Sequence, residues 1–242
     1  MRLAVYVPTY EAESTVGELL ERTAPVARRL GALVLVQDDA STDRTVARAE
    51  AAADGRPDLE VVRNPVNLGY GGNLKRATAV LQERGFAGVA MLHGDLQYRP
   101  EDLPSLVAPI VAGRADLVLG SRLLGRPGRG EMPRYKWTGN RLLTAAVNRR
   151  FHTGLTDPHT GFVAFTMSAA RALRLPTCAD GHEITADMCL RALRGGLRIE
   201  EVAIPTTYGP GSRSCSPSTS VRYGCYLLRS LGRPRAGSAR GR

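Results

Sequence analysis

A short apolar run near the middle of the chain ends in three polar residues that could bind a divalent cation. The run is 89–92, and His93, Asp95 and Gln97 follow it. Such a run predicts a buried parallel strand, and open α/β sheets bind ligands at the carboxyl ends of their strands. A carboxylate beside an imidazole and an amide oxygen suits a divalent cation that carries a phosphorylated substrate.

Two further acids follow another apolar run. Asp38 and Asp39 come directly after residues 32–36. A carboxylate at a strand tip could accept hydrogen bonds from a uracil or a ribose. Turn and capping chemistry explains the polar residues at 41–43, but it explains two adjacent acids at a strand end poorly. Two strands thus bring acids towards one edge of a sheet, which points to an enzyme.

The loop at 64–72 and the Asp-Pro pair at 157 each allow two interpretations. The loop contains Asn67 and Gly69 and leads into a helix whose amino end could face phosphates. Because the loop has neither a GxGxxG pattern nor a P-loop ending, a turn with glycines at positive φ explains it equally well. Asp157 could be a general base or could orient an acceptor, or it could simply form a turn.

Charged residues from Arg122 onward also allow both a functional and a structural interpretation. Glu183 and Asp187 lie four residues apart, so on a helix they share a face, either around a cation or in solvent. Arg122, Arg134 and Lys136 are candidate phosphate partners, although each alone is also compatible with a surface charge.

The hydrophobic pattern predicts the secondary structure. Up to about residue 122, strands are expected at 2–7, 32–37, 59–62, 87–92 and 116–119, with helices between them that end near 30, 53, 84 and 112. Ser14 and Asp43 should cap the first two helices, and Gly31 should end the first. This β-α order with short connections favours a parallel, doubly wound α/β sheet flanked by helices.

Beyond residue 122 the alternation changes. A basic, glycine-rich segment at 123–130 precedes predicted helices at 134–151, 183–194 and 219–231 and predicted strands at 161–167 and 198–204. No linker interrupts the chain, so we expect a single domain over 1–232 with halves 1–122 and 123–232. Residues 233–242 are expected to form a basic, disordered tail.

The formal net charge is +10, and no acid follows Glu201, whereas seven arginines do. Such an end could meet substrate phosphates or an anionic membrane surface. Nucleic acid is the weakest partner, because the arginines lack interleaved aromatics and no binding motif is present.

The compartment is predicted from the cysteines and the hydropathy. Cys178, Cys189, Cys215 and Cys225 have no CxxC or zinc spacing, so thiols in a reducing cytosol are expected. No signal peptide precedes the first strand, and no apolar run approaches the roughly 20 residues of a membrane span. We therefore expect a cytoplasmic protein, with any membrane contact peripheral, at the inner face.

Taken together, the motifs resemble glycosyltransferase family 2, nucleotide-sugar transferases of GT-A fold, and especially its polyprenyl-phosphate (dolichyl-phosphate-mannose-synthase-like) branch. The resemblance runs through nearly the whole chain. The matching segments are Val7-Pro-Thr-Tyr10-Glu-Ala-Glu13, Asp38-Asp39-Ala-Ser-Thr-Asp43, Asn67-Leu-Gly69, Gly94-Asp95-Leu-Gln97 with Pro100-Glu101, Gly120-Ser-Arg122, His159-Thr-Gly161-Phe162, and Glu200-Glu201-Val202 with Pro205.

The resemblance implies roles for these residues. The half 1–122 would bind the nucleotide, and 123–232 would face the acceptor. Asp95, with Gln97 and His93, would bind Mg²⁺ or Mn²⁺ on the donor diphosphate, and Arg122 and the basic residues of 126–136 would neutralise phosphate charge. Asp95, Arg122 and Asp157 would serve catalysis. Substrate binding would fall to Pro8, Tyr10, Glu13 and Asp39 around the nucleoside, and to Asp38, Asn67, Gly69, Lys75, Gly94, Lys136, His159 and Glu183.

The chain departs from the family pattern at three positions. His93 stands where the family usually has the first acid of Asp-x-Asp, and imidazole suits Mn²⁺ better than Mg²⁺. Glu11 replaces a usual Asn, and Val163 replaces a common Arg. We also expect no membrane-spanning tail of the kind found in some relatives.

The resemblance implies an inverting, metal-dependent transfer of a sugar from a UDP- or GDP-sugar. Polyprenyl phosphate is the first acceptor we expect, and a hydroxyl acceptor in polysaccharide or small-metabolite glycosylation is the alternative. A non-catalytic nucleotide-sugar-binding homologue and a nucleotidyltransferase are rivals. The second should have a glycine-rich, Arg-containing loop after the first strand, where this chain has Pro8-Thr-Tyr10.

Overall fold

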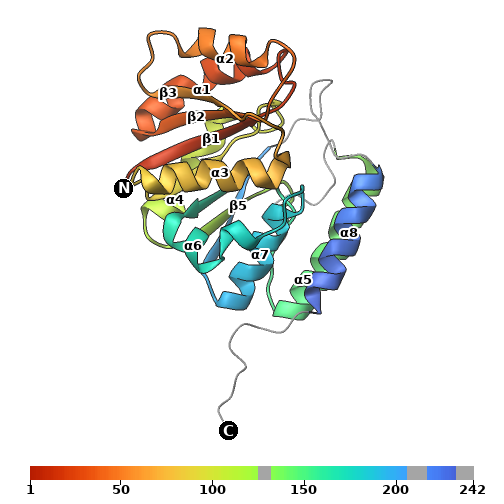
Figure 1. Cartoon of the computed structure of the whole chain (residues 1–242). Helices are drawn as coiled ribbons and strands as arrows, with labels where there is room; N and C mark the ends of the chain where they lie inside the picture. The colour runs from red at the N-terminus through yellow and green to blue at the C-terminus, as the bar shows by residue number, and fades with distance from the viewer. Residues whose placement is uncertain (125–131, 206–216, 233–242) are drawn as a thin grey trace.

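A seven-stranded sheet forms the centre of the protein (Figure 1). The computed structural model describes residues 1–124, 132–205 and 217–232. The strand order is β3-β2-β1-β4-β6-β5-β7, and all neighbours are parallel except β6, which runs antiparallel to β4 and β5. The strands are β1 (Leu3–Thr9), β2 (Leu33–Asp38), β3 (Leu59–Arg63), β4 (Gly88–Met91), β5 (Leu117–Ser121), β6 (Val163–Thr166) and β7 (Ile199–Ala203).

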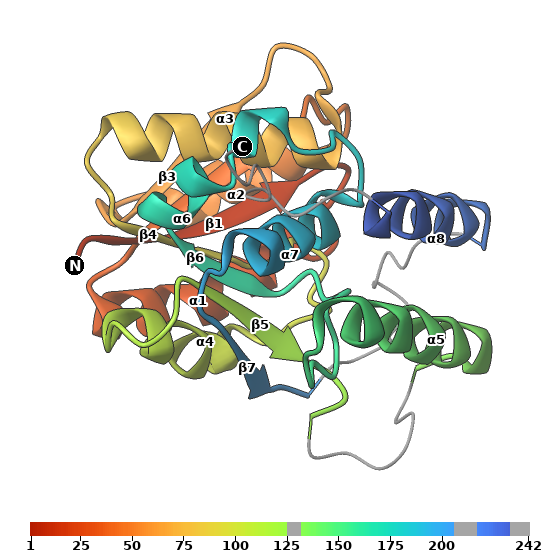
Figure 2. The ribbon, with the colours of Figure 1, turned by 90° about the horizontal axis from the view of Figure 1, so that it is seen from below.

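Helices cover both faces of the sheet (Figure 2). One core contains apolar residues of α1 (Val16–Leu30), α2 (Thr45–Ala53) and α4 (Leu103–Val111), the last preceded by the 3₁₀ turn η1 (Pro100–Asp102). The other contains residues of α3 (Gly69–Glu83), α6 (Met167–Ala172), η2 (Leu175–Thr177) and α7 (Ile184–Gly195). Side chains alternate along β1, so Leu3, Val5 and Val7 join the first core and Ala4 and Tyr6 the second.

Two long helices form a third group beside this body. They are α5 (Arg134–Phe151) and α8 (Pro217–Leu231), which lie side by side in both views (Figures 1 and 2). Val147 and Phe151 of α5 and Leu227 and Leu231 of α8 pack with residues of α7. This apolar contact fixes both helices to the body.

The predicted α/β sheet is confirmed, with corrections at element ends. Gly31 ends α1 in a left-handed conformation (φ 59°), as predicted. Ser14 does not cap α1, because Thr15 precedes the first helical residue and no side-chain cap bond forms. The short helix α6 was not predicted; the Thr166 side chain caps it by accepting the N–H of Ala169 at 3.0 Å.

Among the described residues, no helix has the length and hydropathy that a membrane span requires. Cys178 and Cys189 are buried thiols and Cys225 is an exposed one, whereas Cys215 lies outside the described residues. The predicted tail at 233–242 also lies outside them.

The start of α3 meets the segment before α7 so closely that only glycine fits. The Gly71 N–H donates to the Asp180 carbonyl at 2.8 Å, and a Cβ on Gly71 would come within 2.5 Å of the Ala179 carbonyl oxygen. Both partners are backbone, so a side chain there must displace the chain.

We expect Gly71→Ala to lower the free energy of unfolding by roughly 1–3 kcal/mol, the usual cost of overpacking. Gly17→Ala in α1 is the matched control, because a Cβ there meets nothing within 4 Å. It should be neutral or stabilising by up to about 1 kcal/mol. Urea unfolding measures both, and equal effects of the two variants would contradict the close approach at Gly71.

Candidate active site

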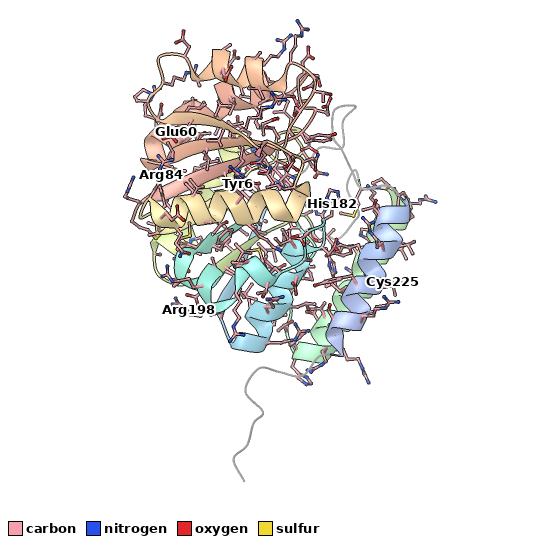
Figure 3. The ribbon with its side chains drawn as sticks, in the orientation of Figure 1. Tyr6, Glu60, Arg84, His182, Arg198 and Cys225 are labelled. Atoms are coloured by element: carbon pink, nitrogen blue, oxygen red, sulfur yellow. The ribbon has the colours of Figure 1, made fainter. Side chains whose placement is uncertain are left out.

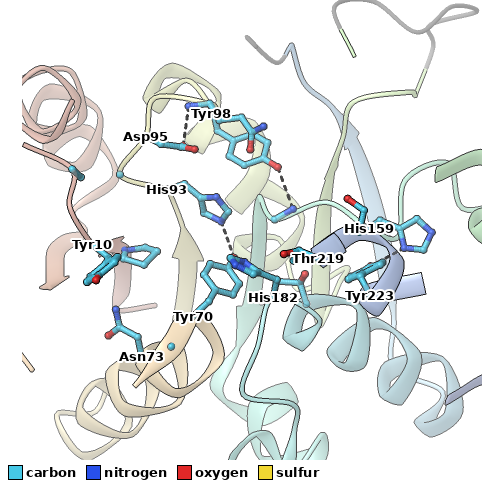
Figure 4. A pocket seen from close by; sticks show the side chains of 18 of the residues that line it. Tyr10, Tyr70, Asn73, His93, Asp95, Tyr98, His159, His182, Thr219 and Tyr223 are labelled. Atoms are coloured by element: carbon cyan, nitrogen blue, oxygen red, sulfur yellow. Dashed lines mark hydrogen bonds between the residues drawn. The ribbon is translucent and has the colours of Figure 1, made fainter. Parts of the chain in front are cut away.

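A cavity of about 740 Å³ opens at the carboxyl ends of the central strands (Figure 4). Its wall is formed from both halves of the chain. The predicted residues that line it are Pro8, Tyr10, Asp39, Asn67, Gly69, His93, Gly94, Asp95, Gln97, Arg122, Lys136 and His159. Glu13, Asp38, Lys75, Asp157 and Glu183 do not line it. The structure therefore brings most, but not all, of the predicted residues together.

Asp38 and Asp39 have different surroundings. Asp38 is fully buried, and its carboxylate accepts hydrogen bonds from the Ser41 N–H at 2.8 Å and from the Thr9 hydroxyl at 3.3 Å. It therefore stabilises the turn after β2. Asp39 reaches the cavity, so of the two acids it is the one that a nucleoside could meet.

The amino end of α3 already has its partners. The Asp39 carboxylate accepts the N–H groups of Leu68 and Gly69, each at 2.9 Å, and the Asp180 carbonyl accepts that of Gly71. Gly69 has a φ of 74°. The structure therefore supports the turn interpretation of this loop, because the N–H groups that we expected to face phosphates bind the protein itself.

Four of the predicted residues outside the cavity make ion pairs: Glu13, Asp38, Lys75 and Asp157. Glu13 pairs with Arg44 at the surface. The Lys75 ammonium is 2.7 Å from Asp180 and also donates to the Cys178 carbonyl, so it stabilises the segment before α7.

Asp187, the predicted partner of Glu183 on a shared helix face, does not lie in solvent. Its buried carboxylate is 3.1 Å from Arg191, one turn further along α7. The interpretation of this face as a solvated one is therefore wrong for Asp187.

The loop after β4 presents one carboxylate to the cavity. Asp95 is half-buried, and its Oδ1 accepts the N–H of Gln97 at 3.1 Å across a turn in which Leu96 has a φ of 57°. Within the described part of the chain, no three His, Cys, Asp or Glu residues gather as a cation site. The donor set thus suits a cation that takes most of its ligands from phosphate oxygens and water, as Mg²⁺ commonly does.

His93 turns its ring towards the other wall of the cavity rather than towards Asp95 (Figure 4). Its Nε2 is 2.8 Å from the Tyr70 hydroxyl, and the ring packs edge-on against Tyr98. A Cβ on Gly161 would come within 2.5 Å of the imidazole. Burial lowers the pKa of His93 more than the Asp95 charge raises it, so the ring is neutral near pH 7.

A buried ion pair supports the cavity wall just after β5. The Arg122 guanidinium bonds both oxygens of Asp157, at 2.6 and 2.9 Å, and the Asn140 amide donates to the same carboxylate at 2.8 Å. Burial alone would raise the pKa of Asp157, but Arg122 and Asn140 outweigh it and hold that pKa below its ordinary value. A carboxylate so engaged accepts a proton poorly.

His159 lies near enough to feel the charges of this pair, and it contacts α8. Its Nδ1 is 2.8 Å from the Tyr223 hydroxyl, and burial lowers its pKa to about 4. Its Nε2 is buried and has no hydrogen-bond partner among the described residues.

Several cavity residues were not predicted. Most are aromatic or hydroxyl residues from distant segments. They are Tyr70, Asn73, Tyr98, His182, Thr219 and Tyr223. Tyr70 and Tyr98 lie inside or beside motifs that the sequence shows, whereas His182 and Tyr223 have no sequence signal.

Comparisons with known proteins agree with this geometry. The family model described as Glycosyl transferase family 2 matches residues 4–174. An undecaprenyl-phosphate mannosyltransferase of Micrococcus luteus is 33% identical over 84% of this chain and 83% of its own. The low-salt glycan biosynthesis hexosyltransferase Agl6 of Haloferax volcanii is 32% identical over 86% of this chain, which spans about half (48%) of that relative.

Solved structures share the fold. Glucosyl-3-phosphoglycerate synthase of Mycobacterium tuberculosis, in complex with Mn²⁺, UDP and phosphoglyceric acid, has a TM-score of 0.74 at 21% identity. The match covers 98% of this chain and 80% of that one. At this identity the likeness concerns the GT-A architecture alone.

The Arg122–Asp157 pair predicts a large effect on stability. We expect Asp157→Asn to lower the free energy of unfolding by roughly 2–4 kcal/mol, because it leaves a largely buried guanidinium without its counter-charge. Glu60→Gln is the matched control, since Glu60 also bonds Arg84 through both oxygens, at 2.7 Å each, but at the surface (Figure 3). It should cost less than about 1 kcal/mol.

The same pair predicts a pH dependence. Because the folded pKa of Asp157 is lowered, its stabilisation is complete above the unfolded value of about 3.9 and is lost as the pH falls through the folded value. The stability gap between the unchanged protein and Asp157→Asn should therefore close below about pH 4. Urea unfolding at several pH values measures this gap, and a gap that stays constant down to pH 3 would argue against a lowered pKa.

Proposed function

The chain belongs to glycosyltransferase family 2, and on that premise we propose that it transfers a sugar from a UDP- or GDP-sugar to polyprenyl phosphate, with inversion at the anomeric carbon. The family and its named transferases support a glycosyltransferase, and a family match sets the nucleotidyltransferase rival aside. The donor, the stereochemistry and the acceptor are our proposal.

The donor half of the cavity suits a nucleoside diphosphate. Pro8 and Tyr10 offer apolar surface to a base, and the Asp39 carboxylate offers an acceptor for base or ribose donors. Two complexes of the Mycobacterium tuberculosis synthase support a nucleotide here, since one contains UDP with Mn²⁺ and the other UDP with Mg²⁺.

Asp95 is the residue that we assign to the metal, assisted by the Gln97 side chain. When bound, Mg²⁺ or Mn²⁺ would neutralise charge on the departing diphosphate. We assign His93 a positioning role instead, because its Nε2 bonds Tyr70 and its ring fills the space beside Gly161.

One observation carries the choice of acceptor. Among the described lining residues from 122 to 223 there is no carboxylate, whereas Arg122 and Lys136 are cationic. A phosphate acceptor is already an anion, so one of its oxygens can form the new bond to the anomeric carbon as the bond to the nucleoside diphosphate breaks. No proton has to be removed, and the two cations offset the charge that accumulates.

We assign Asp157 to the positioning of Arg122. Its two oxygens bond the guanidinium and its backbone N–H donates to Glu201 at 2.8 Å, so the carboxylate is fixed on both sides. A general-base role would need an oxygen that faces the reacting atoms, and Asp157 does not line the cavity.

A hydroxyl acceptor is the second candidate, and His159 is the observation that favours it. His159 lines the cavity as a neutral imidazole, and its buried Nε2 has no hydrogen-bond partner among the described residues, so it could take the proton that a hydroxyl must lose. The name of the Micrococcus luteus relative supports a lipid phosphate as acceptor. The name of the Haloferax volcanii relative specifies hexosyl transfer without naming an acceptor.

Asp95→Asn should remove the metal-dependent part of nucleotide binding. Calorimetry with UDP and GDP, with and without Mn²⁺, measures it, and sugar transfer should fall by about 100-fold or more. Asp54→Asn, an exposed acid after α2, is the control and should change neither quantity. Metal-dependent binding that survives in Asp95→Asn would refute this metal assignment.

His159→Gln discriminates between the acceptors. With a phosphate acceptor no base is needed, so transfer of labelled sugar into organic-extractable polyprenyl phosphate should fall by less than about tenfold. With a hydroxyl acceptor that relies on His159, the loss should be about 100-fold or more. If the unchanged protein labels a hydroxyl acceptor but no lipid phosphate, our choice of acceptor is wrong.

A further inference from the structure

We propose that the exposed faces of α5 and α8 form a docking surface for an anionic phospholipid membrane. The inference rests on the proposed function, since it names the place from which a lipid-borne acceptor would reach the cavity. Five residues of α5 and four of α8 define this docking surface: Arg134, Tyr135, Arg141, Leu142 and Arg149, and Val221, Arg222, Leu228 and Arg229.

Both helices repeat a pair of one basic and one apolar residue. On α5 the pairs begin at Arg134 and Arg141, and on α8 they begin at Val221 and Leu228. In each helix the spacing is seven residues, which is close to two helical turns, so successive pairs share a face. All nine residues are exposed, so the face that they share on each helix points away from the protein core.

The apolar members are unusually exposed. Eight large hydrophobic side chains of the described protein are exposed, and four of them belong to these two helices: Tyr135, Leu142, Val221 and Leu228. The other side of each helix is satisfied, since it packs on α7 or lines the cavity. The exposed apolar groups therefore have no core of their own in the described structure.

The charge of the two helices has one sign. Neither contains an acid, and together they contain Lys136 and six arginines. In the described structure, no ion pair joins an arginine of the docking surface to a carboxylate. Arginines beside exposed apolar groups suit an anionic bilayer surface, where the apolar side chains enter the headgroup region and the guanidinium groups meet lipid phosphates.

The docking surface adjoins the acceptor half of the cavity. Tyr135 and Lys136 near the start of α5, and Thr219, Ser220 and Tyr223 near the start of α8, line that cavity. Tyr223 also bonds His159, so α8 is directly connected to the site (Figure 4). A membrane on this surface would present its lipid phosphates at the mouth of the cavity.

The chain contains its own reporter for this contact. Trp137 is the only tryptophan, and it lies on α5. We expect the full chain to bind vesicles of phosphatidylglycerol and phosphatidylcholine in equal parts, with a blue shift of the Trp137 emission. Phosphatidylcholine alone should cause neither. Binding of equal strength to both kinds of vesicle would overturn the proposal.

Variants separate this surface from the overall basic charge. Each cation near an anionic membrane contributes roughly a fivefold gain in partitioning, so Arg149→Gln with Arg229→Gln should weaken vesicle co-sedimentation by about 25-fold. Leu142→Ser with Leu228→Ser should suppress the blue shift. Arg76→Gln with Arg171→Gln, on exposed positions of α3 and α6, has the same charge change and should keep full binding.

The basic end of the chain requires its own control. Arg233→Gln with Arg235→Gln should keep most of the binding. If this variant loses binding while the α5 and α8 variants retain it, the docking surface is wrongly placed. Unchanged unfolding temperatures exclude misfolding as the cause of any loss.

A water-soluble, short-chain polyprenyl phosphate distinguishes this inference from the proposed function. If docking alone is wrong, the protein transfers sugar to this acceptor but ignores anionic vesicles. If the proposed acceptor alone is wrong, the protein binds the vesicles through α5 and α8 but transfers to no lipid phosphate. If both hold, the α5 and α8 variants lose transfer in vesicles and keep it with the soluble acceptor.

Discussion

The buried ion pair between Arg122 and Asp157 is the interaction on which the cavity wall after β5 depends. A buried carboxylate and a largely buried guanidinium are tolerable only as partners, since each alone would bear a large desolvation cost. The pair connects the end of β5 to the segment before β6, and Asn140 and Glu201 extend it to α5 and β7. One charge pair thereby fixes the segments that enclose half of the cavity, and it fixes the direction of the arginine itself.

The donor side has an equivalent constraint in Asp39. Its carboxylate accepts two backbone N–H groups at the start of α3 and an amide of Asn64. These hydrogen bonds offset the desolvation cost of burying the Asp39 carboxylate. The same bonds fix the loop before α3, which borders the cavity. Asp157 and Asp39 thus act alike, because each carboxylate fixes the chain segments around one part of the cavity.

The sequence predicts the secondary-structure elements better than it predicts the hydrogen-bond partners within the cavity. Period-two and period-3.6 patterns are local, so the strands and long helices, such as 134–151, could be read from the residues. The placement of Asp95 at a strand end followed from the same patterns. Hydrogen-bond partners are not local: Tyr70 reaches His93, and Tyr223 reaches His159 across 64 residues. Which of two adjacent acids faces inward, Asp38 or Asp39, depends on such partners, and so could not be predicted.

If Asp95 holds a metal as proposed, the division of charge within the cavity gives a physical reason why one acid in the loop after β4 is enough. The described lining carries its carboxylates, Glu11, Asp39 and Asp95, on the donor side, and its cations Arg122 and Lys136 on the acceptor side. A nucleoside diphosphate and a lipid phosphate both bring negative charge, so each further carboxylate between them would raise the cost of their approach. A neutral His93, bonded to Tyr70, keeps the loop in shape without adding that charge. On the proposed function a neutral His93 is compatible with an active enzyme, because a second acid at this position would add negative charge where two anions must enter.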